Sequence, residues 1–156
     1  MPDPLRPLTV TLSDVCFVHW PVAPASVEAV VPDWLEPDTA DGSAWMSALA
    51  LSMDRFDVLG LPVREGLEGV NLRTYVRTPT GDRAVYFCSL DVTDRLAADT
   101  ASTLFRLPYH DARIRRRQEG DRTEVVARRR SDPETRLTLT FEPTAEPTTA
   151  SPDTLA

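Results

Sequence analysis

The chain has 156 residues, of which 42% are hydrophobic and 26% are charged, and its net charge at pH 7 is −7. This length suffices for one domain and is short for two. Its apolar runs are only a few residues long, far below the roughly 20 residues that cross a bilayer, and its first residues show neither a secretory nor a transit signal. We therefore expect a soluble, cytoplasmic protein without a membrane partner.

The chain contains no lysine, because all 17 residues counted as lysine or arginine are arginines. An enzyme that forms an internal Schiff base needs a primary amine that can lose its proton, and arginine does not provide one. Schiff-base chemistry is therefore excluded for these 156 residues.

The second feature of the composition is its acidity. The chain has 24 acidic residues against 17 basic residues, all of which are arginines. This pattern indicates salt adaptation, in which hydrated carboxylates maintain solubility. The alternative is a GC-rich genome that favours arginine codons. Salt adaptation predicts greater resistance to urea in molar KCl than in dilute buffer.

The first predicted elements are a strand at residues 15–20, rich in β-branched and aromatic residues, and a short helix at residues 24–31. A proline at its first turn suits the helix, and Pro32 stops it. Asp41-Gly42 is a turn signal, and it precedes a strand-like run at residues 44–53.

Residues 70–78 alternate as a half-buried strand does, with residues 71, 73, 75 and 77 on one face. A turn at residues 79–82 leads to a second strand at residues 83–91, so the two strands should form a hairpin. Residues 93–105 carry apolar side chains at helical spacing and predict an amphipathic helix that ends before Pro108.

Three more strands are predicted at residues 109–117, 122–130 and 135–141, separated by turns that contain glycine or proline. The predicted fold class is α+β and β-dominated. We expect a curved antiparallel sheet or a partly closed barrel with one main helix.

The predicted domain division follows from composition. Residues 1–9 are an N-terminal extension, and residues 10–142 form a single β-rich domain. Residues 143–156 are a Pro/Thr/Ser-rich tail without periodicity, which we expect to be disordered.

Five short motifs carry a resemblance that extends over about residues 10–141. They are His19-Trp20, the turn at residues 41–45, Asn71-Leu72-Arg73-Thr74-Tyr75-Val76, the segment at residues 86–91, and Leu107-Pro108-Tyr109. With these motifs in order, the chain resembles the YqjF-like family, bacterial and archaeal proteins of unknown function in the acetoacetate decarboxylase-like superfamily. The resemblance implies a cone-shaped β-barrel with a central cavity, and it supplies no activity. Superfamily members that decarboxylate or dehydrate β-keto acids use a Schiff-base lysine, so a lysine-dependent decarboxylase is excluded here on chemistry, whatever the fold.

Similar proteins continue beyond this length with further strands that carry an Arg-Tyr motif and a later His-x-Pro-Trp-like motif. We therefore expect either a shortened family member or a sheet completed in another way, such as dimerisation, because an unpaired sheet edge is a liability.

The candidate ligand-binding residues are Asn71, Arg73, Tyr75, His19 and Trp20. The first three share one predicted strand face, with successive side chains about 7 Å apart. The planar fork of an arginine suits a carboxylate or phosphate, so this face predicts an anion-binding site. The alternative is a structural ion pair of Arg73 with Glu68 or an aspartate in a polar core.

His19 next to Trp20 predicts either a general base beside a ring that shapes a pocket, or simple packing at a strand end. Cys16 and Cys88 have apolar neighbours, which fits small buried side chains better than a disulfide. No short cysteine or histidine spacing typical of a metal site is present. We expect neither metal nor cofactor.

Residues 112–130 hold eight arginines against three acidic residues, a local charge of +5. Such an island could attract nucleic acid or an acidic partner. Few aromatic residues interleave with these arginines, and the rest of the chain is acidic. Pairing with carboxylates is therefore the favoured interpretation, and nucleic acid is not an expected partner.

Two functional hypotheses follow. The leading one is a protein that binds a small organic acid or similar anion against Arg73. The competing one is a non-catalytic interaction protein that uses a sheet edge or residues 112–130 to bind a partner or a second copy of itself.

Overall fold

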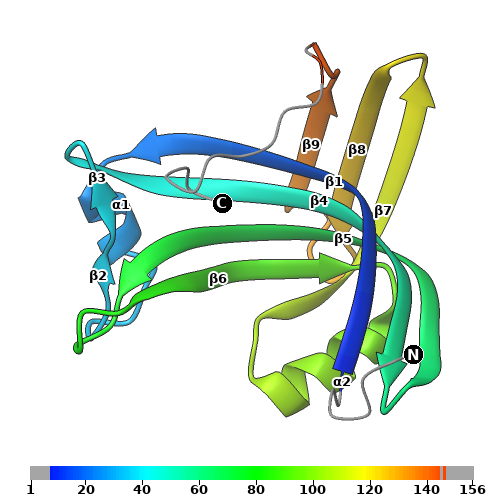
Figure 1. Ribbon diagram of the computed structural model, residues 1–156, viewed down its shortest axis with the longest axis horizontal. Coiled ribbons are helices and arrows are strands. Elements are labelled where there is room, and N and C mark those ends of the chain that lie inside the picture. Colours follow the sequence, from blue (N-terminus) through cyan, green and yellow to red (C-terminus); the bar gives the residue numbers. More distant parts are fainter. Residues whose placement is uncertain (1–7, 145, 147–156) are drawn as a thin grey trace.

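A single curled sheet organises the structure, a computed structural model that describes residues 8–144 and 146. Across the sheet the strand order is β1-β4-β5-β6-β7-β8-β9, with short β2 on β5 and short β3 on β4 (Figure 1). The predicted β-dominated α+β class is confirmed. The elements are β1 (Leu8–Val22), α1 (Pro24–Glu28), β2 (Glu36–Pro37), β3 (Thr39–Ala40), β4 (Ser43–Val58), β5 (Leu61–Arg77), β6 (Arg83–Val92), α2 (Arg95–Phe105), β7 (Tyr109–Glu119), β8 (Arg122–Arg129) and β9 (Arg136–Phe141).

Tight turns join the long antiparallel strands. The predicted turn at Asp41-Gly42 connects β3 to β4, and both residues have positive φ, 51° and 78°. Leu59-Gly60 repeats this geometry between β4 and β5, with φ of 51° and 78°. Positive φ at both central residues is what the type I′ hairpin turn requires, and the twist of this turn matches that of the strands.

Several predicted elements have different lengths in the structure. β4 continues to Val58 rather than ending at residue 53, and β5 begins at Leu61 rather than at residue 70. β1 begins at Leu8 and continues through Pro21 to Val22, although the sequence predicted an end before this proline. Proline lacks a ladder donor and is tolerated here because β1 is an edge strand. Helix α1 is shorter than predicted and ends at Glu28.

One pairing in this otherwise antiparallel sheet is parallel, a detail that the sequence did not predict. β6 and β7 pair through Leu90–Val92 and Tyr109–Asp111. A parallel neighbour needs a crossover connection, and α2 provides it. The Asp94 carboxylate caps this helix by accepting a hydrogen bond from the Ala97 amide at 3.0 Å.

The predicted domain division stays a prediction. β1 starts two residues before the expected boundary at residue 10, and β9 ends at Phe141. Residues 1–7, 145 and 147–156, which include most of the predicted extension and tail, lie outside the described residues.

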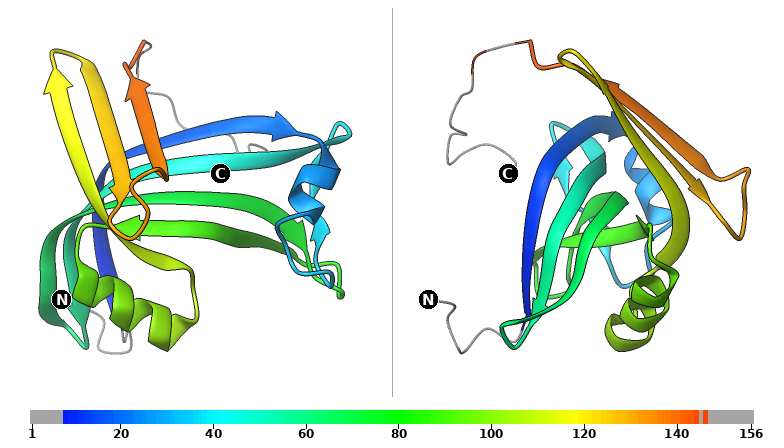
Figure 2. Two further views of the ribbon diagram at one scale, coloured as in Figure 1. Left: turned by 180° about the vertical axis from the view of Figure 1, so that it is seen from behind. Right: turned by 90° about the vertical axis from the view of Figure 1, so that its right-hand side faces the viewer.

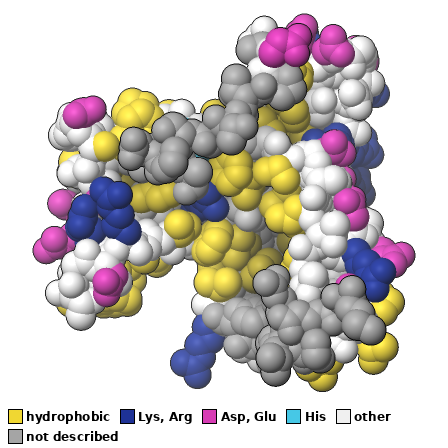
Figure 3. All heavy atoms as spheres, in the orientation of Figure 1, with side chains coloured by type: hydrophobic (Ala, Val, Ile, Leu, Met, Phe, Trp, Pro, Cys, Tyr) yellow, Lys and Arg dark blue, Asp and Glu magenta, His cyan; other side chains and the backbone are white. Residues whose placement is uncertain are grey.

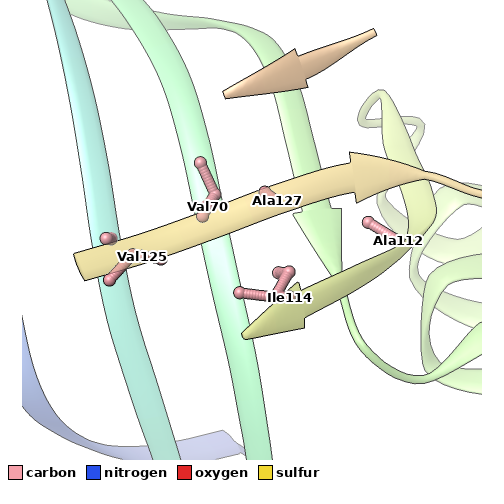
Figure 4. Close-up of a cluster of buried hydrophobic side chains, with 6 residues drawn as sticks. Val70, Ala112, Ile114, Val125 and Ala127 are labelled. Atoms are coloured by element: carbon pink, nitrogen blue, oxygen red, sulfur yellow. The ribbon is translucent and has the colours of Figure 1, made fainter. Parts of the chain in front are cut away.

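The main core lies between the middle of the long strands and the layer formed by β7, β8 and β9, which stands on one side of them (Figure 2). Val70 of β5 faces the side chains of β7 and β8 in this core (Figure 4). The buried members are Ala50, Val70, Ala112, Ile114, Val125 and Ala127. A second cluster lies at the α1 end and contains Val27, Val31, Leu35, Ala44 and Val76.

Both clusters use the same face of β4 and β5, because Ala44, Ala50, Val70 and Val76 are all even-numbered positions of regularly alternating strands. We call this face the packed face. The odd-numbered positions of the same stretches form the opposite face, which we call the open face.

Two ion pairs also join the layers across the packed face. Arg129 Nε of β8 lies 3.0 Å from the Asp91 carboxylate of β6, and Arg116 Nε of β7 lies 3.2 Å from the Glu68 carboxylate of β5. Ser89 and Ser52 donate to the same two carboxylates, at 3.0 and 2.7 Å. Hydrogen bonds of this kind are what make a buried carboxylate tolerable.

Candidate functional site

The open face brings together residues from β1, β4 and β5. In the strand register His19 lies opposite Ser47, and Ser47 lies opposite Arg73. Tyr75 is two positions from Arg73 on β5, and Phe17 is two positions from His19 on β1, so both point to the same side. These five residues form a continuous set of contacts, which we call the Arg73 cluster.

Arg73 is half-buried at the centre of the cluster. Its Nε donates to the Ser47 hydroxyl at 3.2 Å. The guanidinium carbon lies 4.6 Å from the centroid of the Phe17 ring and 5.9 Å from that of Tyr75, within the range of cation–π attraction. A fully buried hydroxyl and two aromatic rings therefore hold this cation in place.

Tyr75 links Arg73 to His19 through a series of polar atoms. The Ser47 hydroxyl lies 3.4 Å from the Tyr75 hydroxyl, which lies 3.5 Å from Nδ1 of His19. Both distances are at the long end for hydrogen bonds. The predicted residues Arg73, Tyr75 and His19 thus meet, although 56 residues separate His19 from Tyr75.

The ion-pair alternative for Arg73 does not occur with the residue that the sequence suggested. The Glu68 carboxylate pairs with Arg116 and accepts from Ser52 on the packed face. Among residues 8–144 and 146, no ion pair includes Arg73. Its charge is therefore not compensated by a carboxylate of the described chain.

The other two predicted site residues lie differently. Asn71 is on the open face, opposite Leu49 and Leu90, one side-chain step from Arg73. Trp20 lies opposite Met46, an even-numbered position on the packed face, and does not join the cluster. Consecutive strand residues point to opposite sides of a sheet, so His19 and Trp20 cannot share a site.

Sequence reasoning missed Phe17 and Ser47. Phe17 could have been found from its spacing of two from His19 within the predicted strand. Ser47 carried no local signal beyond being a hydroxyl in an apolar run, since only the pairing of β4 with β5 places it beside Arg73. Trp45, two positions from Ser47, has a buried indole nitrogen without a hydrogen-bond partner in the described structure.

Hydrophobic side chains gather over the middle of the face turned toward the reader in Figure 3, with a basic side chain among them. This is the side away from β7, β8 and β9 (Figure 2). Phe17 on this face is 46% exposed and Val85 is 42% exposed. The Arg73 cluster thus combines apolar surface with one cation.

The two cysteines and His110 are the other candidate groups, and they do not belong to the Arg73 cluster. Cys16 and Cys88, predicted to be small buried side chains rather than a disulfide, are both free and half-buried. Burial raises the pKa of each thiol, and the Arg116 charge partly offsets this at Cys16. Burial also lowers the pKa of His110, with Arg129 lowering it further and Asp91 raising it.

No group of three or more His, Cys, Asp or Glu side chains in the described part of the chain is placed to hold a metal ion. No helix among the described residues is long and apolar enough to cross a membrane.

The arginine-rich segment at residues 112–130 divides between the two sides of its layer. Arg116 and Arg129 point inward to Glu68 and Asp91. Arg130 pairs with Asp111 at 3.2 Å, and Arg117 lies 4.0 Å from Glu119. Four arginines of this segment are therefore paired with carboxylates, two of them on other strands of the sheet.

Comparison with solved structures identifies relatives of the fold. Acetoacetate decarboxylase from Legionella pneumophila superposes with a TM-score of 0.73 at 12% identity, over 95% of this chain and 57% of that chain. An acetoacetate decarboxylase-like enzyme from Sphingomonas wittichii gives 0.57 at 14% identity, over 81% and 55% of the two chains. The enduracididine biosynthesis enzyme MppR, complexed with pyruvate, gives 0.59 at 14% identity, over 86% and 57%.

Comparison of sequences identifies the family. The uncharacterized protein YqjF of Bacillus subtilis is 39% identical over 158 residues, which cover 99% of this chain and 65% of YqjF. The chain thus spans less than two thirds of the length of this relative. The model of the DUF2071 family, described as an uncharacterized conserved protein, matches residues 9–156. The chain therefore belongs to the DUF2071 family and has the acetoacetate decarboxylase-like fold.

Proposed function

We propose that the protein binds a small organic acid, or a similar anion, through the guanidinium of Arg73. The observation that carries the proposal is a half-buried arginine held by a hydroxyl and two rings, with no carboxylate partner among the described residues. A partly desolvated charge without a counter-ion is unfavourable. A bound anion would supply the missing charge.

The geometry of Arg73 indicates how the anion would bind. A guanidinium offers five N–H donors in a planar fork. The Arg73 Nε already donates to the Ser47 hydroxyl, whereas neither Nη donates to another described residue. The edge formed by the two Nη atoms is therefore open for the two oxygens of a carboxylate. Asn71, one step along β5, would orient the ligand by a further hydrogen bond.

Two relatives of the fold support the chemical class. The Legionella structure is an acetoacetate decarboxylase, and MppR was crystallised with pyruvate. Acetoacetate and pyruvate are both small carboxylates. At 12% and 14% identity these proteins share the fold, and their site residues are not transferred to this chain.

The proposed role is binding rather than Schiff-base catalysis. These 156 residues contain no lysine, and Arg73 stays protonated, so it anchors an anion and cannot act as a base. The position of His19 beside the Tyr75 hydroxyl would place it at the edge of a bound ligand.

Calorimetric titration of acetate, pyruvate and acetoacetate tests the proposal. Arg73→Ala should weaken binding at least tenfold, because hydrogen bonds to a charged group contribute about 1.5–3 kcal/mol. Arg77→Ala is the matched control: Arg77 lies on the same strand face but pairs with Asp38 at 2.8 Å, so its loss should leave binding unchanged. Equal affinities of the parent and Arg73→Ala would reject the site.

A second candidate function is association through β1. This strand pairs only with β4 among the described residues and lies at the edge of the sheet. Its exposed side chains include Val10, Leu12, Val15, Phe17 and Val18, each 37–47% exposed. A long apolar edge of this kind is a template for another strand. The partner would be a second copy of the chain, paired along β1.

Sedimentation velocity at low and at molar salt tests this second function. Apolar pairing predicts a dimer that persists in molar salt. A monomer at every salt concentration would overturn it.

A further inference from the structure

We infer that the Arg73 cluster selects planar, conjugated carboxylates over saturated ones of equal size. This inference rests on the proposed function, and it names the ligand class of the same site.

The first observation is the alignment of the aromatic rings. Phe17 and His19 are stacked, with centroids 5.5 Å apart and planes 3° from parallel. His19 and Tyr75 lie 6.4 Å apart with planes 24° from parallel. Two strands, β1 and β5, thus present three ring planes in similar orientation on one face.

The second observation is where the cation lies relative to these rings. The guanidinium carbon is nearest to Phe17, at 4.6 Å, and lies 5.9 Å from Tyr75. A carboxylate bound by Arg73 would therefore lie close to these rings. On this inference, the body of the ligand contacts the π surface of Phe17 and His19.

The third observation is that this surface is accessible. Phe17 is 46% exposed and His19 is also exposed, although both lie on the apolar part of the open face. A flat π system can adopt offset-stacked or edge-to-face contact with such rings, which contributes beyond the area that it buries. A puckered saturated ring makes no such contact.

The chemistry of the cluster thus fits an aromatic acid or a conjugated enol acid. Arg73 binds the carboxylate, and Phe17 and His19 contact the planar body. The Tyr75 hydroxyl, 3.5 Å from His19 Nδ1, is placed to hydrogen-bond a hydroxyl or enol oxygen on that body.

The test compares benzoate with cyclohexanecarboxylate by calorimetric titration at pH 7.5. The two acids share charge and carbon number and differ in planarity and π electrons. Benzoate should bind about three- to tenfold more tightly to the parent protein. Hydrophobicity alone would favour the saturated acid, so tighter binding of benzoate would indicate contact with the aromatic rings.

Phe17→Leu removes the ring and keeps an apolar side chain, and it should bring the affinity ratio close to one. Phe56→Leu is the control, since Phe56 lies opposite Val10 and Arg64, away from the Arg73 cluster. It should leave the ratio unchanged. Urea unfolding of each variant confirms that the fold is retained.

The outcomes separate this inference from the proposed function. Equal binding of both acids, lost in Arg73→Ala, would overturn the inference and leave the anion site intact. A benzoate preference that persists in Phe17→Leu would also overturn it. Absence of binding to the parent, or binding that Arg73→Ala does not weaken, would overturn the proposed function itself.

Discussion

Arginine side chains have different partners on the two faces of the long strands. On the packed face, Arg116 and Arg129 meet carboxylates at 3.2 and 3.0 Å, and their side chains are 15% and 20% exposed. On the open face, Arg73 meets a hydroxyl and two rings, and no described carboxylate compensates its charge.

The difference shows how a structural arginine is distinguished from one available to a ligand. Burial of an ion pair requires that each charge finds its partner within the fold, so such arginines join layers. An arginine whose counter-ion is absent retains its capacity to bind an anion. The residue type is the same, and the surrounding side chains decide its role.

The largest expected effect comes from breaking a pair on the packed face. Arg129→Ala leaves the Asp91 side chain, only 11% exposed, without its cationic partner. We expect a loss of about 3–5 kcal/mol in the free energy of unfolding. Urea unfolding followed by tryptophan fluorescence measures it.

A double variant sharpens this prediction. Replacing Arg129 by Met and Asp91 by Leu together removes both charges, and the stability should recover most of the loss, because well-packed apolar residues replace buried ion pairs at little cost. A single variant Arg129→Ala that loses less than about 1 kcal/mol would contradict a structural role for the pair.

An intermediate effect is expected at Asp94, whose carboxylate both caps α2 and pairs with Arg64 at 3.1 Å. Asp94→Ala should cost about 1 kcal/mol through the lost cap. Asp94→Asn should cost much less, since asparagine caps equally well. Arg64→Ala should change stability by less than about 0.5 kcal/mol, because the pair is exposed.

The pH dependence of the same residue provides a second readout. The hydrogen bond from the Ala97 amide, aided by the Arg64 charge, holds the pKa of Asp94 below its ordinary value, although burial opposes this. The folded state thus favours the ionised form. Its contribution is full above the ordinary carboxyl pKa and is lost as the pH falls through the lowered folded value. Urea unfolding at pH 7 and pH 3 should show a smaller acid-induced loss for Asp94→Asn than for the parent; an equal loss would contradict this account.

The smallest effect on stability is expected at Arg73, where the effect on binding is largest. Arg73→Gln removes the hydrogen bond to Ser47 and two cation–π contacts worth about 0.5–1 kcal/mol each, and these losses are opposed by the relief of an uncompensated charge. The free energy of unfolding should therefore change by about 0.5 kcal/mol or less. A loss comparable to that of Arg129→Ala would place Arg73 among the structural arginines.

Much of the fold was predictable from local patterns. The strands at residues 83–91 and 135–141, the helix ending before Pro108, and the turn at Asp41-Gly42 appear close to where the sequence places them. The hairpin of β4 and β5 around Leu59-Gly60 was missed, since residues 54–69 contain several charged residues and Pro62, which obscure the alternation. The parallel pairing of β6 with β7 was missed because a crossover is a property of the whole sheet.

The candidate site was predictable only in part. Alternation correctly placed Asn71, Arg73 and Tyr75 on one face, and the same rule places Trp20 on the side opposite to His19. No local rule could pair Arg73 with Ser47, which is 26 residues away.

The sequence by itself determined three things: that no lysine Schiff base can form within these residues, where most strands and the main helix lie, and which side chains share a strand face. These are matters of residue chemistry and of short-range periodicity. Only the tertiary structure decided that Glu68 pairs with Arg116 and leaves Arg73 to Ser47, Phe17 and Tyr75. The physical reason is that strand register between distant segments depends on the packing of the whole sheet, and register selects each arginine's neighbours.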